Sequence, residues 1–130
     1  MKFYFAGWTT DCYGLFEKHK VECGLISYWE LKGQRKWRRP KDFFLDSGAF
    51  SAFTQGAKID IDDYCDFIKQ NNPDVYCVLD EIGNFEVTKQ RQVHMEAKGL
   101  TPIPTVHFGA SKREIKYWMD GYEYIAIGGL

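Results

Sequence analysis

The chain has 130 residues, of which 45% are hydrophobic and 17% aromatic, enough apolar material for the core of one domain spanning residues 1–130. A net charge of -1 excludes the strongly basic field of many nucleic-acid-binding proteins, so any contact with a polynucleotide must be local. Every apolar run is well short of the ~18 residues that a membrane span requires, and no contact with a membrane is expected.

The cysteines do not have the spacing of a metal site. Cys12, Cys23, Cys65 and Cys77 form no C-x-x-C pair, and no histidine lies near them at zinc-finger spacing. The chain opens on the strand-like "KFYFAG" instead of a signal peptide. We therefore expect reduced thiols in a cytoplasmic protein, with no metal and no cofactor.

Six short apolar segments predict β-strands. Most of them are apolar throughout, which is typical of parallel strands that are covered on both faces. The segments are Lys2–Gly7, Gly24–Trp29, Phe43–Gly48, Val75–Glu81, Pro102–Gly109 and Tyr124–Leu130.

Helices are expected between the later strands, each with its own start signal. The first has Asp60 as its N-cap. The second begins after Asn84 and ends at Gly99, and the third begins at Ser111, which forms a capping box with Glu114. The side chains expected to be buried are Ile61, Tyr64, Cys65 and Ile68 in the first helix and Ile115, Trp118 and Met119 in the third, which Gly121 closes.

Strands alternating with helices predict an α/β protein with a parallel sheet and right-handed crossovers. An open nucleotide-binding sheet usually has a Gly-rich phosphate loop after its first strand, and "FAGWTTDCYG" has neither usual pattern. The sequence therefore favours a TIM-barrel-like (β/α) fold. Because a complete barrel takes ~250 residues, we expect an incomplete, N-terminal half of a barrel.

In such a barrel the loops after the strands meet at one mouth. Carboxylates, an imidazole and glycines there would form a small pocket for a polar ligand such as a nucleobase, on which Phe50 could stack. The residues at these strand ends are Asp46, Ser47, Asp80, Glu81, His107, Gly128 and Gly129.

Each of these residues also has a purely structural interpretation. Asp46 before Ser-Gly is typical of a turn or a helix N-cap, and the pair Asp80 and Glu81 could cap the next helix. His107 could be a structural histidine, Gly128–Gly129 a tight turn, and Phe50 a core residue.

A basic run from Lys32 to Lys41 carries six cations, no acid and one tryptophan, Trp37. It is either a solvated loop or a contact for phosphates. In the second interpretation the phosphate ligands would be Arg35, Lys36, Arg38 and Arg39.

Three segments resemble one enzyme family. "LDSGAFSAF" resembles the "DSGGFQ" signature of the queuine tRNA-ribosyltransferases (tRNA-guanine transglycosylases), "VLDE" resembles their "DE", and "YIAIGGL" resembles their "IGGL", all in the same order. The N-terminal "KFYFAG" and "GLISYWELKG" look like the phage-type members, which resemble enzymes that place 7-deazaguanine bases in DNA. The resemblance covers Phe43 to Leu130.

The resemblance implies a TIM barrel that exchanges guanine for a 7-deazaguanine in tRNA or DNA through a covalent glycosyl-enzyme intermediate. It would make Asp46 the acid/base carboxylate, Phe50 the aromatic that sandwiches the base, and Asp80 the carboxylate that hydrogen-bonds the Watson–Crick edge. The backbone of Gly129 and Leu130 would also contact the base.

The chain also departs from the family pattern. Ala49 and Ser51 stand where the family has Gly and Gln, and His107 stands at a strand end where Gln is usual. Nothing in the sequence matches the family's nucleophilic aspartate or its zinc-binding Cys/His cluster. The nucleophile is therefore expected from outside this sequence, for example from a second chain that completes the barrel.

We thus expect the base-binding half of a glycosyltransferase site. Two alternatives remain open at this stage. One is a non-catalytic nucleobase-binding module, and the other is an unrelated (β/α) barrel enzyme that uses Asp46, Asp80 and His107.

Overall fold

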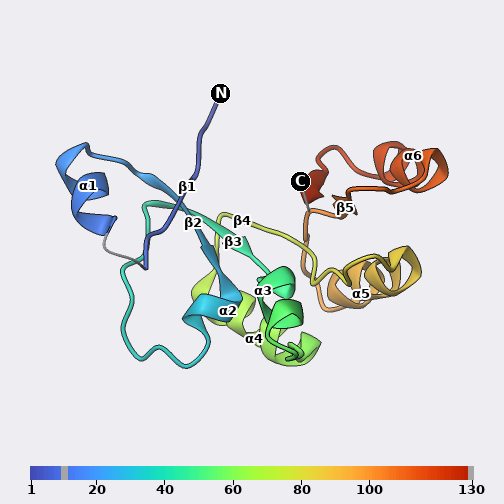
Figure 1. The fold of residues 1–130 in the computed structure, drawn as a ribbon, viewed down its shortest axis with the longest axis horizontal. Helices are drawn as coiled ribbons and strands as arrows, with labels where there is room; N and C mark the ends of the chain where they lie inside the picture. The colour runs from blue at the N-terminus through green and yellow to red at the C-terminus, as the bar shows by residue number, and fades with distance from the viewer. Residues whose placement is uncertain (10–11, 129–130) are drawn as a thin grey trace.

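The computed structural model describes residues 1–9 and 12–128, in which strands and helices alternate along the chain (Figure 1). The strands are β1 (Phe5–Ala6), β2 (Cys23–Ser27), β3 (Asp42–Asp46), β4 (Val75–Tyr76), β5 (Thr105–His107) and β6 (Ala126–Gly128). The helices are α1 (Tyr13–Lys18), α2 (Tyr28–Leu31), α3 (Ala49–Thr54), α4 (Ile61–Asn71), α5 (Phe85–Ala97) and α6 (Lys112–Gly121).

All strand pairs are parallel, and within each sheet every strand lies beside the next one in the chain. β1 to β4 form one sheet in that order, and β5 pairs with β6 in a second, two-stranded sheet. A parallel bridge between Cys77 and Ile103 joins the two sheets, with Val78 N–H donating to Ile103 C=O at 2.9 Å. The α/β class with a parallel sheet is confirmed, and the carboxyl ends of the strands share one edge.

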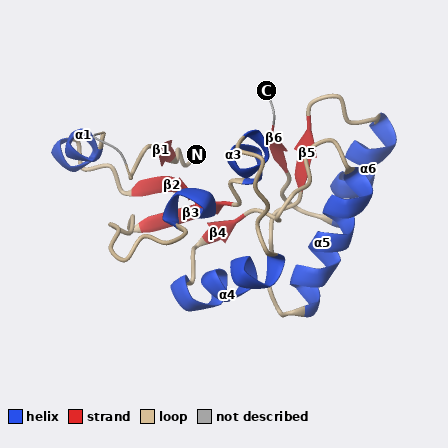
Figure 2. Ribbon diagram, turned by 60° about the horizontal axis from the view of Figure 1, so that its bottom comes forward, coloured by secondary structure: helices blue, strands red, loops and turns tan. Residues whose placement is uncertain are grey.

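The three longer helices lie along one side of the strands (Figure 2). Their predicted start signals are confirmed, because each depends only on local hydrogen bonds. Asp60 accepts from the N–H groups of Asp62 and Asp63, and Asn84 accepts from the N–H of Val87. Ser111 and Glu114 form the reciprocal capping box.

Helix α5 buries a polar stripe, which explains why its sequence shows little hydrophobic periodicity. Its buried residues are Thr88, Gln92 and Met95. Thr88 Oγ1 accepts from the N–H of Glu81 at 2.9 Å, and Gln92 Nε2 donates to the carbonyl of Pro102 at 2.8 Å. The stripe therefore holds the segments that follow β4 and precede β5.

The hydrophobic core lies between the sheet and the helices. Along β3 the residues alternate, with Phe43 and Leu45 fully buried and Phe44 half-buried. Phe43 and Leu45 pack in the core with Tyr64 and Ile68 of α4, whereas Phe44 lines an open pocket on the other face. Phe44 is partly covered on that face by Tyr4, whose ring centroid lies 5.3 Å from its own.

Several strands are shorter than the sequence predicts. The segment predicted as a strand up to Trp29 turns into α2 after Ser27, whose side chain accepts from the N–H of Glu30 and caps that helix. The short helices α1, α2 and α3 were not predicted. In α6, Trp118 is buried as predicted, but Met119 is 63% exposed because it lies about 100° further around the helix, away from β5. The end of the last predicted strand, Gly129 and Leu130, lies outside the described residues.

Candidate functional site

A tight turn follows β3 at the carboxyl edge of the sheet. The N–H of Gly48 donates to Asp46 Oδ2 at 2.8 Å, and the N–H of Ala49 donates to Ser47 Oγ at 3.2 Å. In both bonds the accepting side chain lies two residues before the donating N–H group, which is the pattern of side-chain-stabilised turns. The turn-forming interpretation of Asp46 is therefore correct, and the same turn leaves Asp46 lining a pocket.

Asp80 links three strands through its two carboxylate oxygens. Its Oδ1 accepts from Ser47 Oγ at 2.8 Å, and its Oδ2 lies 2.7 Å from His107 Nε2. The side chains of Asp80 and His107 are only 11% and 15% exposed. These bonds bring together the residues that follow β3 and β4 and the last residue of β5, as expected from the parallel strands.

Asp46 is half-buried, and its surroundings shift its pKa. Burial raises the pKa of its carboxyl above the ordinary value, the negative charge of Asp80 raises it further, and the hydrogen bond from Gly48 opposes the shift. The nearby Cys77 thiol is also buried, and burial together with the charges of Asp46 and Asp80 raises its pKa. Asp46 therefore keeps its proton to a higher pH than an exposed aspartate.

A pocket of about 530 Å³ opens beside these carboxylates. Its volume lies within the range of small-molecule sites. Phe50 of α3, predicted to stack on a flat ring, is 61% exposed and stands on its wall, so the core interpretation of Phe50 is wrong. The predicted site residues that line this pocket are Asp46, Ser47, Phe50, Asp80, His107 and Gly128.

Gly128 belongs to β6 rather than to a turn, and its missing side chain has a packing reason. A Cβ atom there would lie 3.2 Å from Thr105 Cγ2 and 3.8 Å from His107 Cδ2. The backbone of β6 thus approaches the Thr105 side chain closely. Gly129 and Leu130, the two residues expected to contact a base through the backbone, lie outside the described residues.

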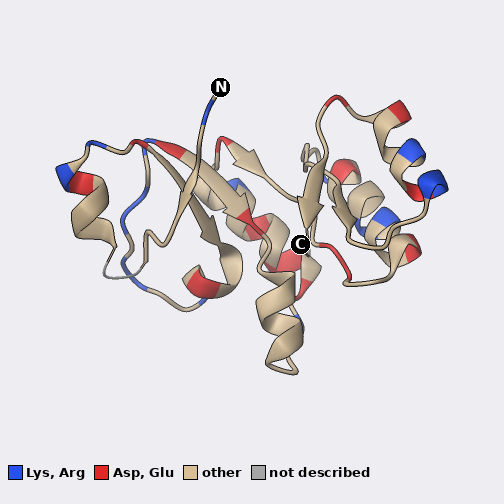
Figure 3. Ribbon diagram, turned by 45° about the horizontal axis from the view of Figure 1, so that its top comes forward, with Lys and Arg blue, Asp and Glu red and all other residues tan. Residues whose placement is uncertain are grey.

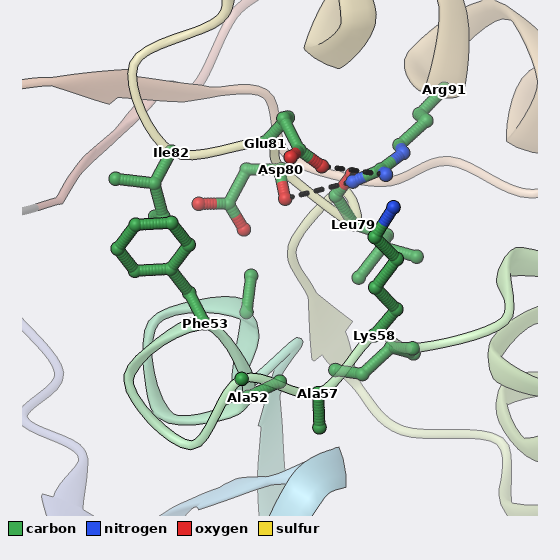
Figure 4. Close-up of a pocket in the computed structure, with 12 residues that line it drawn as sticks. Ala52, Phe53, Ala57, Lys58, Leu79, Asp80, Glu81, Ile82 and Arg91 are labelled. Carbon is green, nitrogen blue, oxygen red and sulfur yellow. Dashed lines mark hydrogen bonds and ion pairs between the residues drawn. The ribbon is translucent and has the colours of Figure 1, made fainter.

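Glu81 points to a different neighbour from the other predicted residues. It pairs with Arg91 of α5 at 2.7 Å, and Arg91 also donates to the carbonyls of Leu79 and Asp80. Both residues line a second pocket of about 290 Å³, with Phe53 and Ile82 on one side and Lys58 and Arg91 on the other (Figure 4). Arg91 was missed in the sequence, because a single cation in a helix has no local signal for the strand end that it contacts.

The basic loop lies on the side of the molecule away from α5 and α6 (Figure 3). Arg39 donates to the carbonyls of Asn71 and Asn72 at the end of α4, before β4 begins, so it lies near the amino edge of the sheet. β3 separates that edge from Asp46 by ~13 Å. Arg38 stacks over Tyr13, 4.1 Å from the ring centroid, while Arg35 and Lys36 are exposed.

Several further features bear on cofactors and partners. Among the described residues, no group of three or more His, Cys, Asp and Glu could hold a metal ion. No helix in the described ranges has the length and apolar character to cross a membrane. No family model, no curated protein and no solved structure matches this chain.

Proposed function

We propose that this chain carries the base-binding half of a base-exchange glycosyltransferase that replaces guanine by a 7-deazaguanine in tRNA or DNA. One observation supports this most directly. A single pocket is lined by a carboxyl group with a raised pKa, Asp46, by the hydrogen-bonded pair Asp80 and His107, and by an exposed aromatic ring, Phe50. Planar purine bases need such an aromatic surface and such polar groups.

In this proposal Asp46 moves the proton of the base. When the glycosidic bond to guanine breaks, negative charge develops on the leaving base, and the protonated form of the Asp46 carboxyl can donate its proton to it. The carboxylate so formed then accepts the proton that the incoming base loses as it forms its own glycosidic bond. The raised pKa of Asp46 suits it to both steps.

The strand order supports a (β/α) barrel as the finer description of the fold. Within each sheet the strands follow chain order without reversal, and a parallel bridge between Cys77 and Ile103 continues that order from one sheet to the other. A doubly wound sheet reverses its order at the ligand site. We propose that the chain forms the N-terminal half of such a barrel. The nucleophile of the glycosyl-enzyme intermediate then comes from the other half, supplied by a further segment or by a second chain.

The polynucleotide must expose its target base before the base can enter this pocket, because the reacting atoms are hidden in a stacked helix. The exposed Phe108, directly after His107, also lines the pocket and offers a second apolar surface beside Phe50. Stacking on an aromatic ring does not depend on whether the base comes from RNA or DNA. The two aromatic side chains therefore support the binding of a flipped base from either tRNA or DNA.

The experiment that tests this proposal is a calorimetric titration of the folded chain with guanine, a 7-deazaguanine base and, as a control, uracil. We expect saturable binding of the two purine-like bases and weaker binding of uracil, whose single ring covers less of Phe50. If the folded chain binds neither guanine nor the 7-deazaguanine, the proposal is wrong. Binding without any exchange in the presence of the second half would favour the non-catalytic module.

A further inference from the structure

Both oxygens of the Asp80 carboxylate are already bonded within the protein. Oδ1 accepts from Ser47 Oγ at 2.8 Å, and Oδ2 lies 2.7 Å from His107 Nε2. An ionised carboxylate can only accept hydrogen bonds, so with Asp80 in that form the hydrogen that joins the two groups is on His107 Nε2. With only 11% of its side chain exposed, Asp80 offers little surface to a ligand.

The backbone holds His107 firmly in this position. The N–H of Phe108 donates to the carbonyl of Gly128, and the N–H of Ala110 donates to the carbonyl of His107 at 3.1 Å. The ring itself is joined to Asp80 through the hydrogen bond at Nε2. The imidazole lines the same pocket as Asp46 and Phe50.

We propose that Asp80 is a positioning residue for His107, and that Nδ1 of His107, rather than the Asp80 carboxylate, accepts a hydrogen bond from an N–H group of the bound base. The identity of the ligand as a purine base rests on the proposed function. In a neutral imidazole one nitrogen carries hydrogen and the other accepts, and the bond to Asp80 determines which is which. Asp80 therefore acts on the base through the tautomer of His107.

This arrangement selects between purines by the hydrogen at N1. Guanine and hypoxanthine carry N1–H, which can donate to an acceptor at Nδ1. Adenine has a lone pair at N1, and two facing lone pairs form no hydrogen bond and leave both acceptors unpaired. We therefore expect guanine and hypoxanthine to bind at least tenfold more tightly than adenine.

The test combines a spectroscopic readout with titrations. In long-range ¹H–¹⁵N spectra of the ¹⁵N-labelled chain, the signals of His107 are assigned by their loss in His107→Phe, which separates them from those of His19 and His94. Spectra are recorded over a series of pH values, and the tautomer is read from those in which the ¹⁵N shifts show a neutral ring. We expect hydrogen on Nε2 and an unprotonated Nδ1.

Two variants test whether Asp80 sets the tautomer of His107 or only stabilises the fold. Asp80→Asn can donate as well as accept, so it should allow both tautomers of His107 and weaken guanine binding at least tenfold. Ser47→Ala removes the other bond to Asp80, and also the bond from the N–H of Ala49, but leaves the bond to His107, so the Nε2–H tautomer should persist in its spectrum. Hypoxanthine should follow guanine in each variant.

The outcomes are distinguishable from those that test the proposed function. An Nδ1–H tautomer in the parent chain would overturn the positioning role of Asp80. Equal affinities for guanine and adenine, or an Asp80→Asn variant that is folded and binds guanine as the parent does, would overturn the role of Nδ1. If the parent bound no purine at all, the proposed function and the base contact would both be wrong, and the spectrum alone would decide the tautomer.

Discussion

Gly48 and Trp29 are packed so closely that only a glycine fits. A Cβ atom on Gly48 would lie 2.5 Å from Cβ of Trp29, and Gly48 also has a positive φ of 73°. Its N–H is the donor to Asp46 in the turn after β3. The turn that aims Asp46 therefore depends on the contact between this glycine and α2.

Replacing Gly48 by alanine should destabilise the protein by about 2–4 kcal/mol, because it adds the cost of a left-handed conformation to a steric clash. Gly56 is the matched control, since its φ is 67° but nothing lies within 4 Å of an added Cβ. Gly56→Ala should cost only ~1 kcal/mol. Urea unfolding of both variants measures the difference, and equal losses would show that the contact with Trp29 relaxes without cost.

The raised pKa of Asp46 predicts that this residue lowers the stability of the folded protein in a pH-dependent way. The folded state binds a proton at Asp46 more tightly than the unfolded chain does, so stability falls as the pH rises from about 3.8 through the raised pKa. Asp46→Asn keeps the shape and an acceptor for the N–H of Gly48 but cannot ionise. We expect it to raise the melting temperature at pH 7 and to lose this advantage near pH 3.

A second variant, at Asp42, provides the control for that prediction. Asp42 has a lowered pKa because it accepts hydrogen bonds from Lys2 and Tyr4, so the sign of its effect is opposite. Asp42→Asn should therefore lower the melting temperature at pH 7. A stabilising Asp42→Asn or a destabilising Asp46→Asn at neutral pH would contradict the electrostatic description of the two residues.

Phe50 and Phe53 form a matched pair for testing the stacking surface. Both lie on α3 and are exposed to a similar extent, 61% and 63%, but Phe50 lines the pocket with Asp46 and His107, whereas Phe53 lines the second pocket. Phe50→Ala should weaken guanine binding about tenfold, consistent with the ~1–3 kcal/mol of a stacked base. Phe53→Ala should change it less than twofold, and equal effects would place the base elsewhere.

The basic loop should divide into a structural part and a part that is free to contact phosphates. Arg39 hydrogen-bonds the carbonyls at the end of α4, so Arg39→Ala should cost ~1 kcal/mol of stability. Arg35 and Lys36 are exposed, and removing both charges should leave stability unchanged. If they contact phosphates, the slope of log K against log salt for a DNA duplex should fall by about 2. An unchanged slope would make the run a solvated loop.

Local signals in the sequence were sufficient for the helices that begin with a cap. Asp60, Asn84 and the pair Ser111 and Glu114 each satisfy N–H groups within four residues of themselves, so no distant part of the fold is needed to predict them. The order of strands and helices likewise follows from alternating apolar and amphipathic segments. These features determined the α/β class and the common edge at which Asp46, Asp80 and His107 lie.

Only the tertiary structure decided which partner each side chain of that edge takes. Asp80 contacts Ser47, 33 residues before it, and His107, 27 residues after it, while Glu81, its neighbour in the chain, turns to Arg91. Such pairings cannot be predicted from the local sequence, because a carboxylate accepts hydrogen bonds from any donor that the fold brings within about 3 Å. The exposure of Met119 likewise depends on which side of α6 packs against the rest of the protein. The pKa of Asp46 rises because other parts of the folded chain bury its carboxyl group.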